Sequence, residues 1–72
     1  MTIHSDSLRY GRAGEVLRWI WDGKCTKEIA AEMGLSAKTV EWYRAELFKC
    51  FEVNNPVTLC RLALEAGLLK LR

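Results

Sequence analysis

The chain has 72 residues and a formal net charge of +2 at pH 7, and 50% of its residues are hydrophobic. This length fits one small domain, and the composition is typical of a globular protein rather than a disordered one. No apolar run approaches the roughly 18–20 residues of a membrane span, and the first residues lack the features of a secretory signal. We therefore expect a cytoplasmic protein that does not enter a membrane.

Several kinds of site are also excluded. The three cysteines, Cys25, Cys50 and Cys60, are odd in number and form no CxxC pair, which argues against a disulfide framework or a zinc site. The only histidine is His4, and no acid–base pair or glycine-rich phosphate loop is visible. We therefore predict no enzyme activity, no catalytic residue, no metal or other cofactor, and no small-molecule ligand.

The chain begins with a polar stretch and then becomes helical. Residues 1–7 show no periodicity, so we expect a flexible arm before a single domain over residues 8–72. Hydrophobic residues then recur at helical spacing, which predicts a first helix over residues 12–22 that stops at Gly23.

A short helix, a glycine turn and a longer helix follow. Thr26 is a suitable N-cap for a second helix over residues 26–33, and Gly34 can adopt the left-handed conformation that ends it. Ser36 can cap a third helix over residues 37–52. This arrangement predicts a helix-turn-helix, with an ordinary αα-hairpin as the alternative on pattern alone.

The third helix has two distinct faces. Its predicted core face consists of Val40, Tyr43, Leu47, Cys50 and Phe51. Its predicted outer face consists of Lys38, Glu41, Trp42, Ala45 and Lys49. The outer face combines cations with an acid and a large aromatic side chain, so it is a candidate binding surface.

A fourth helix is predicted over residues 56–66, with Pro56 in its first turn and Gly67 after its end. One face suits the core and consists of Leu59, Leu62, Ala63 and Ala66. A second, partly apolar face consists of Val57, Cys60, Arg61 and Leu64. Since a surface helix in a monomer needs only one apolar stripe, the second face predicts a partner; the alternative is a helix sunk deep in the core. No segment alternates as a strand does, so the fold class is all-α, with four helices.

Residues 23–47, GKCTKEIAAEMGLSAKTVEWYRAEL, resemble the LuxR/FixJ (GerE-like) helix-turn-helix family of bacterial transcription regulators. The family pattern is matched in register by Gly23, Lys27, Glu28, Ile29, Ala30, Gly34, Leu35, Ser36, Thr39 and Val40. The resemblance extends over residues 12–69 and is closest to the stand-alone type. It implies a four-helix DNA-binding domain whose third helix enters the major groove and whose fourth helix forms the dimer.

The resemblance also implies roles for individual residues. Lys38 and Thr39 match positions that contact phosphate, where the helix dipole favours an anion. The further phosphate candidates are Thr26, Lys27, Arg44 and Lys49. The candidates for base contacts on the outer face are Glu41, Trp42 and Ala45. The matching dimer positions are Val57, Cys60, Arg61 and Leu64. For any single lysine, the alternative to a phosphate contact is that it only forms part of a solvated basic face.

The chain departs from the family pattern at several positions. Glu41 and Trp42 replace polar or small residues, Tyr43 replaces a histidine, and Glu52 stands where the family prefers glycine. Our first hypothesis is a homodimer that inserts helix 37–52 into the major groove of a palindromic or pseudo-palindromic double-stranded DNA site. The alternative is a small protein-binding modulator, an anti-activator or co-regulator, that pairs with a LuxR-type regulator through helix 56–66 or the Trp42 face.

Overall fold

The computed structural model describes residues 11–70, which form four helices and no strand. The helices are α2 (Arg12–Trp21), α3 (Thr26–Met33), α4 (Ala37–Phe51) and α5 (Pro56–Glu65). The predicted all-α fold with four helices is therefore confirmed for this part of the chain. The predicted arm, residues 1–7, lies outside the described residues.

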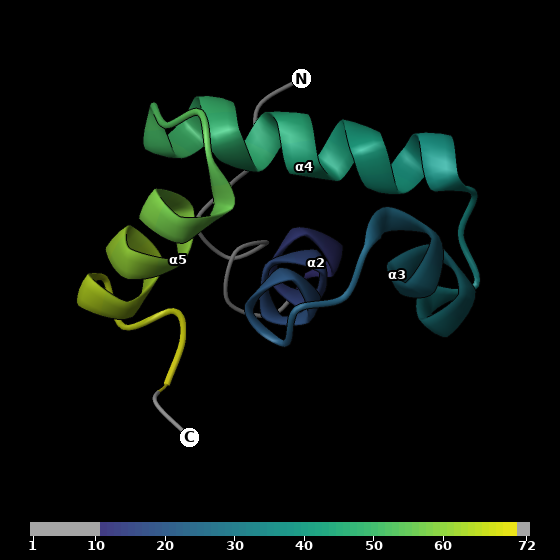
Figure 1. Ribbon diagram of the computed structural model, residues 1–72, viewed down its shortest axis with the longest axis horizontal. Coiled ribbons are helices and arrows are strands. Elements are labelled where there is room, and N and C mark those ends of the chain that lie inside the picture. Colours follow the sequence, from purple (N-terminus) through teal and green to yellow (C-terminus); the bar gives the residue numbers. More distant parts are fainter. Residues whose placement is uncertain (1–10, 71–72) are drawn as a thin grey trace.

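The longest helix, α4, organises the domain. It packs against α2, α3 and α5, and α2 also packs against α5. Figure 1 shows α4 lying across the other three helices, with α3 beneath its first turns and α5 beneath its last ones. One side of α4 is thus covered by the other described helices, and no described helix lies against the opposite side.

Local sequence signals set the helix ends. Gly34 ends α3 with φ of 65°, and the Ser36 side chain accepts a hydrogen bond from the backbone N–H of Thr39 at the start of α4. Asn55 caps α5 in the same way, with Pro56 in the first turn. The helices α2, α4 and α5 end one residue before the predicted end, because the last predicted residue of each is the C-cap.

One predicted cap was wrong. Thr26 is the first residue of α3, and Cys25 takes the N-cap position with extended backbone. The Cys25 side chain accepts from the backbone of Glu28, while the Cys25 N–H donates to the Glu28 carboxylate over 3.0 Å. This reciprocal pair is a capping box, in which a thiol replaces the usual hydroxyl.

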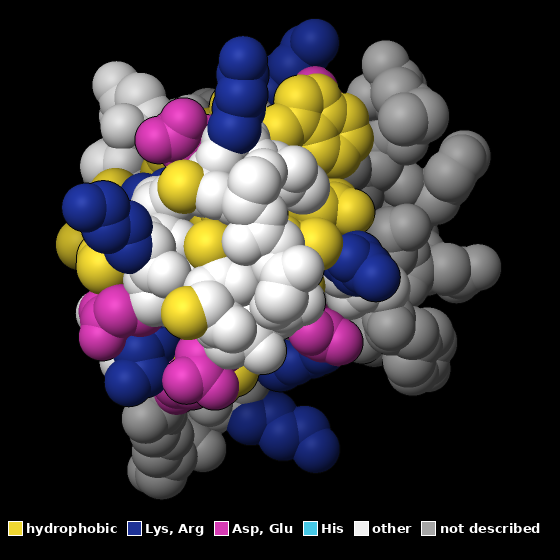
Figure 2. Space-filling model, turned by 90° about the vertical axis from the view of Figure 1, so that its right-hand side faces the viewer, with side chains coloured by type: hydrophobic (Ala, Val, Ile, Leu, Met, Phe, Trp, Pro, Cys, Tyr) yellow, Lys and Arg dark blue, Asp and Glu magenta, His cyan; other side chains and the backbone are white. Residues whose placement is uncertain are grey.

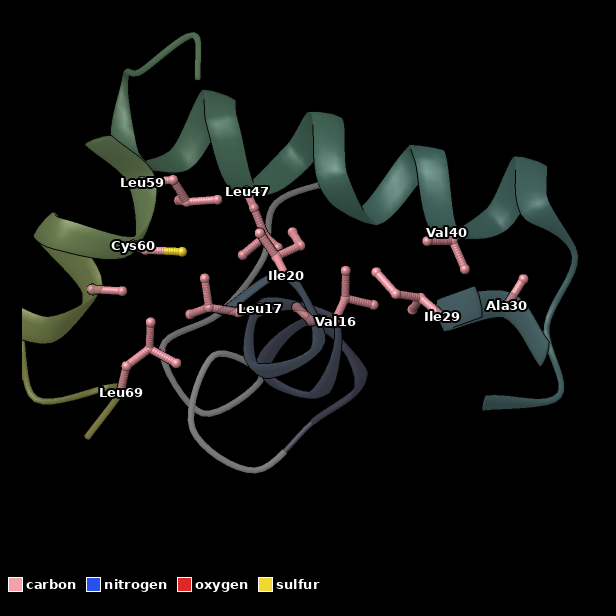
Figure 3. Close-up of a cluster of buried hydrophobic side chains, with 12 residues drawn as sticks. Val16, Leu17, Ile20, Ile29, Ala30, Val40, Leu47, Leu59, Cys60 and Leu69 are labelled. Carbon is pink, nitrogen blue, oxygen red and sulfur yellow. The ribbon is translucent and has the colours of Figure 1, made fainter. Parts of the chain in front are cut away.

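The core lies between α4 and the other helices, as Figure 3 shows. Its fully buried large side chains are Val16, Leu17, Ile29, Val40, Leu47 and Leu59. Val40 and Leu47 confirm the predicted core face of α4, whereas Cys50 is exposed. The prediction for Cys50 was wrong because that face is narrower than the spacing suggested, and Tyr43 and Phe51 already form its half-buried edges.

The predicted faces of α5 also need correction. Leu59 and Ala63 are buried as expected, but Ala66 is exposed because it is the C-cap beyond the last turn. Cys60, expected on the second face, is only 7% exposed, and its side chain lies in the core in Figure 3. Burial raises the pKa of the Cys60 thiol.

The described helices give no candidate for a membrane span, since none of them is long and apolar enough to cross a bilayer.

Candidate nucleic-acid interface

The connection between α3 and α4 is short and contains several hydrogen bonds. Gly34 adopts the left-handed conformation, so the N–H of Leu35 donates to the carbonyl of Ala30 over 2.9 Å. Two residues later the Ser36 hydroxyl lies 3.1 Å from the Thr39 nitrogen and 2.8 Å from the Thr39 hydroxyl. These hydrogen bonds define the end of α3 and the start of α4, and the two helices pack against each other as in a helix-turn-helix.

The first turn of α3 carries exposed charge. Lys27 and Glu28 are exposed at this end, next to Thr26, which is half-buried. Hydrogen bonds from the backbone and side chain of Cys25 lower the pKa of the Glu28 carboxyl, and nearby Lys24 lowers it further. Glu28 is therefore committed to capping α3, and Lys24 and Lys27 are the exposed cations at this end.

The outer face of α4 is open. Its exposed residues are Lys38, Glu41, Trp42, Ala45 and Lys49, the set that helical spacing predicted. Thr39 is exposed beside them. At about 100° per residue these side chains cluster opposite the buried Val40 and Leu47. A surface of this width, on which none of the described helices packs, can enter a groove as wide as the major groove of DNA.

Trp42 is the largest exposed side chain on this face. It is 40% exposed, and its ring meets Tyr43 edge to face, with centroids 5.1 Å apart and an angle of 76° between the rings. Both rings border a shallow hollow at the start of α4, together with Ser36, Lys38 and Thr39. Three predicted site residues, Lys38, Thr39 and Trp42, thus meet in one place.

Arg44 lies apart from this group. It is half-buried, and its guanidinium carbon is 5.8 Å from the centroid of the Phe48 ring, within the range of a cation–π contact. It borders a second hollow with Thr26, Lys24 and Cys25 at the start of α3. The structure therefore brings Arg44 to the α3 end of the surface. Lys24 was missed in the sequence, because it precedes the helix and only this hollow reveals its neighbours.

Charges of both signs surround this end of the domain. Figure 2, which faces α3 and the start of α4, shows basic and acidic side chains around a centre of mostly uncharged groups. The overall charge is only +2. This face therefore carries separate cations and not a uniform basic patch.

The predicted dimer residues gather at a separate place. Val57, Arg61 and Leu64 border an apolar hollow of about 360 Å³ together with Ile20, Trp21, Pro56 and one edge of Cys60. Val57 is 78% exposed. Trp21 was not anticipated at this surface, because no sequence signal links α2 with α5. Its indole Nε1 is buried and has no hydrogen-bond partner among the described residues.

Comparison with known proteins yields one family. The family described as bacterial regulatory proteins, luxR family, matches residues 11–63. The chain is 41% identical over 63 residues to an uncharacterized response regulatory protein, YgeK, of Escherichia coli K12. It is 46% identical over 50 residues to the transcriptional regulatory protein UhpA of the same strain. It is 34% identical over 58 residues to the transcriptional activator protein AnoR of Acinetobacter nosocomialis.

These similarities cover most of this chain but only part of each relative. The matched segments are 88%, 69% and 81% of this chain, and 43%, 26% and 24% of YgeK, UhpA and AnoR respectively. The chain therefore spans less than half the length of these relatives. No solved structure matches the chain.

Proposed function

We propose that this chain, which belongs to the luxR family of bacterial regulatory proteins, is a DNA-binding transcriptional regulator. In this proposal it acts as a homodimer on a palindromic or pseudo-palindromic site, with α4 in the major groove of each half-site. Two recognition helices related by a dimer axis reach half-sites about one helical turn, roughly 10 bp, apart.

The observation that carries the proposal is the open outer face of α4. The Gly34 turn and the Ser36 cap connect α3 to α4, the two helices pack against each other, and among the described residues no helix covers the face of α4 opposite the core. A helix-turn-helix presents its second helix to DNA in this way. Base edges would meet Glu41, Trp42 and Ala45.

Phosphate contacts would come from the two helix starts. Lys38 and Thr39 lie in the first turn of α4, and Thr26 and Lys27 in the first turn of α3, where the helix dipoles favour anions. Lys49 extends the same face toward the end of α4, and Arg44 lies beside the α3 start. Each phosphate contact adds to the salt dependence of binding.

The dimer would form through α5. An isologous contact places the same surface on both sides of a two-fold axis. Val57 is the most exposed large hydrophobic residue among those described, and it borders the apolar hollow together with Trp21, Arg61 and Leu64. Covering these groups on both subunits would remove apolar surface from water, at about 25 cal/mol per Å² before the cost of association.

Fluorescence anisotropy on random duplex DNA tests the DNA-binding proposal. We expect binding to weaken as salt rises, and Lys38→Ala and Lys27→Ala to weaken binding to all sequences and to reduce the salt slope by about one each. Lys70→Ala is the matched control, because Lys70 lies beside Arg18 and Leu68, away from α4. Absence of DNA affinity at low salt, or an equal effect of Lys70→Ala, would contradict the proposal.

Val57→Asp tests the dimer separately. Val57 is in the first turn of α5, where a carboxylate is compatible with the helix dipole, so the subunit should remain folded. Sedimentation with and without DNA should show a dimer for the wild type and for Val57→Thr, and a monomer for Val57→Asp. A dimer that survives Val57→Asp would exclude this surface.

A second candidate function is a protein-binding modulator of another luxR-family regulator. Trp42 favours it, because an exposed tryptophan is a frequent anchor in protein interfaces and Glu41 beside it would repel phosphate. A pull-down with mass spectrometry, run beside a gel shift, separates the two functions. The modulator would be favoured if the wild type captures a luxR-family protein, Trp42→Ala does not capture it, and the wild type shifts no DNA.

A further inference from the structure

Glu41 has an unusual position for an acid on this surface. It lies in the first half of the outer face of α4, exposed, and its carboxylate has no hydrogen bond or ion pair to any other described residue. The cations one turn away on the same helix, Lys38 and Arg44, form no ion pair with it. If α4 enters the major groove, this carboxylate loses its water and has no hydrogen-bond or ion-pair partner among the described residues.

In the groove, hydrogen-bond donors on the base edges can replace the water that the carboxylate loses. A carboxylate only accepts hydrogen bonds. In the major groove guanine presents the acceptors N7 and O6 and thymine the acceptor O4, so both repel it. Adenine offers an amino donor, but with the acceptor N7 beside it. Cytosine offers the N4 amino group as a donor and presents no acceptor, so it is the base that suits a carboxylate best.

The neighbouring aromatic side chains strengthen this selectivity. Trp42 follows Glu41 directly on the exposed face, and its edge-to-face contact with Tyr43 restricts its ring. A large ring in the groove excludes water from the base edges around it. A mismatched base would then leave the carboxylate desolvated and unpaired, which costs more than the loss of one hydrogen bond.

We propose that Glu41 is a specificity-determining residue and that each half-site carries a cytosine whose N4 amino group donates to its carboxylate. The inference rests on the proposed DNA-binding function and specifies the sequence class it recognises.

Selection of binding sites from a randomised duplex tests it, with the wild type, Glu41→Gln and Glu41→Ala in parallel. The wild type should prefer a C·G pair at one position per half-site, by about tenfold or more in affinity over an A·T pair. Glu41→Gln should prefer adenine at that position, because a glutamine amide pairs with adenine N6 and N7. Glu41→Ala should lose the preference there and keep the others. Glu65→Gln, the same change at an exposed position at the end of α5, should select the same site as the wild type.

Anisotropy on duplexes that differ only at the selected position should reproduce these ratios. Wild-type binding with no position that responds to Glu41→Gln, or with an A·T pair preferred by the wild type at the responding position, would overturn the inference alone. A wild type without affinity for any duplex would overturn the proposed function and this inference together.

Discussion

Replacement of Glu52 by glycine should stabilise the domain. Glu52 is the C-cap of α4 and adopts the left-handed conformation, with φ of 55° and ψ of 44°; it is the only described non-glycine residue with positive φ. The turn depends on this conformation, since the next N–H, that of Val53, donates to the Phe48 carbonyl over 2.9 Å. The side chain is exposed and makes no hydrogen bond to a described residue, so its loss removes no such contact.

The size of the effect follows from two terms. The left-handed conformation costs a residue with a Cβ roughly 1–2 kcal/mol, and glycine avoids this cost. Glycine in turn makes the unfolded chain more flexible, which offsets about 0.5–1 kcal/mol of the gain. A carboxylate at a helix C-terminus also opposes the helix dipole, at about 0.3–1 kcal/mol. Glu52→Gly should therefore raise the free energy of unfolding by about 1–2 kcal/mol. In a domain of this size that corresponds to a melting temperature higher by at least about 4 °C.

Urea and thermal unfolding followed by far-UV circular dichroism measure this change. Glu52→Gln is the control, because it removes the charge and keeps the left-handed side chain; its gain should be smaller and should vanish at high salt. The gain in Glu52→Gly should persist at high salt, because the conformational term is not electrostatic. A Glu52→Gly protein no more stable than Glu52→Gln would refute the reasoning.

Three further predictions concern stability and reactivity. The pKa of Glu28 in the folded protein lies below its usual 4.5, so its capping contribution to stability should be complete above pH 4.5 and be lost as the pH falls through the folded value. Glu28→Gln should therefore reduce the loss of stability below pH 4.5, and an unchanged loss would contradict this. The Cys60 thiol is buried with a raised pKa, so mass spectrometry should find iodoacetamide on the exposed Cys25 and Cys50 well before Cys60; equal rates would contradict that burial. Leu47 is fully buried under the centre of α4, so Leu47→Ala should lower the free energy of unfolding by about 2–5 kcal/mol in urea, and a loss below 1 kcal/mol would mean that the core closes around the cavity.

Local sequence signals were sufficient for the order of the helices and for their bounds to within one residue. The turn at Gly34, the Ser36 cap and the proline in the first turn of α5 act over three or four residues. Their effect therefore does not depend on the rest of the fold. The exposed face of α4 was predictable for a related reason, because helical periodicity alone sets which side chains stand opposite Val40 and Leu47.

Long-range packing decided what periodicity could not. Cys60 is apolar enough for either side of α5, and only the position of that helix against the core buries it. Trp21 and Val57 are far apart in sequence, and they border one hollow only because α2 packs against α5. Arg44 was one basic residue among several until the fold brought it beside Lys24 and Thr26. Periodicity orders side chains around one helix axis, but the relative positions of two axes depend on the shapes of all the side chains between them.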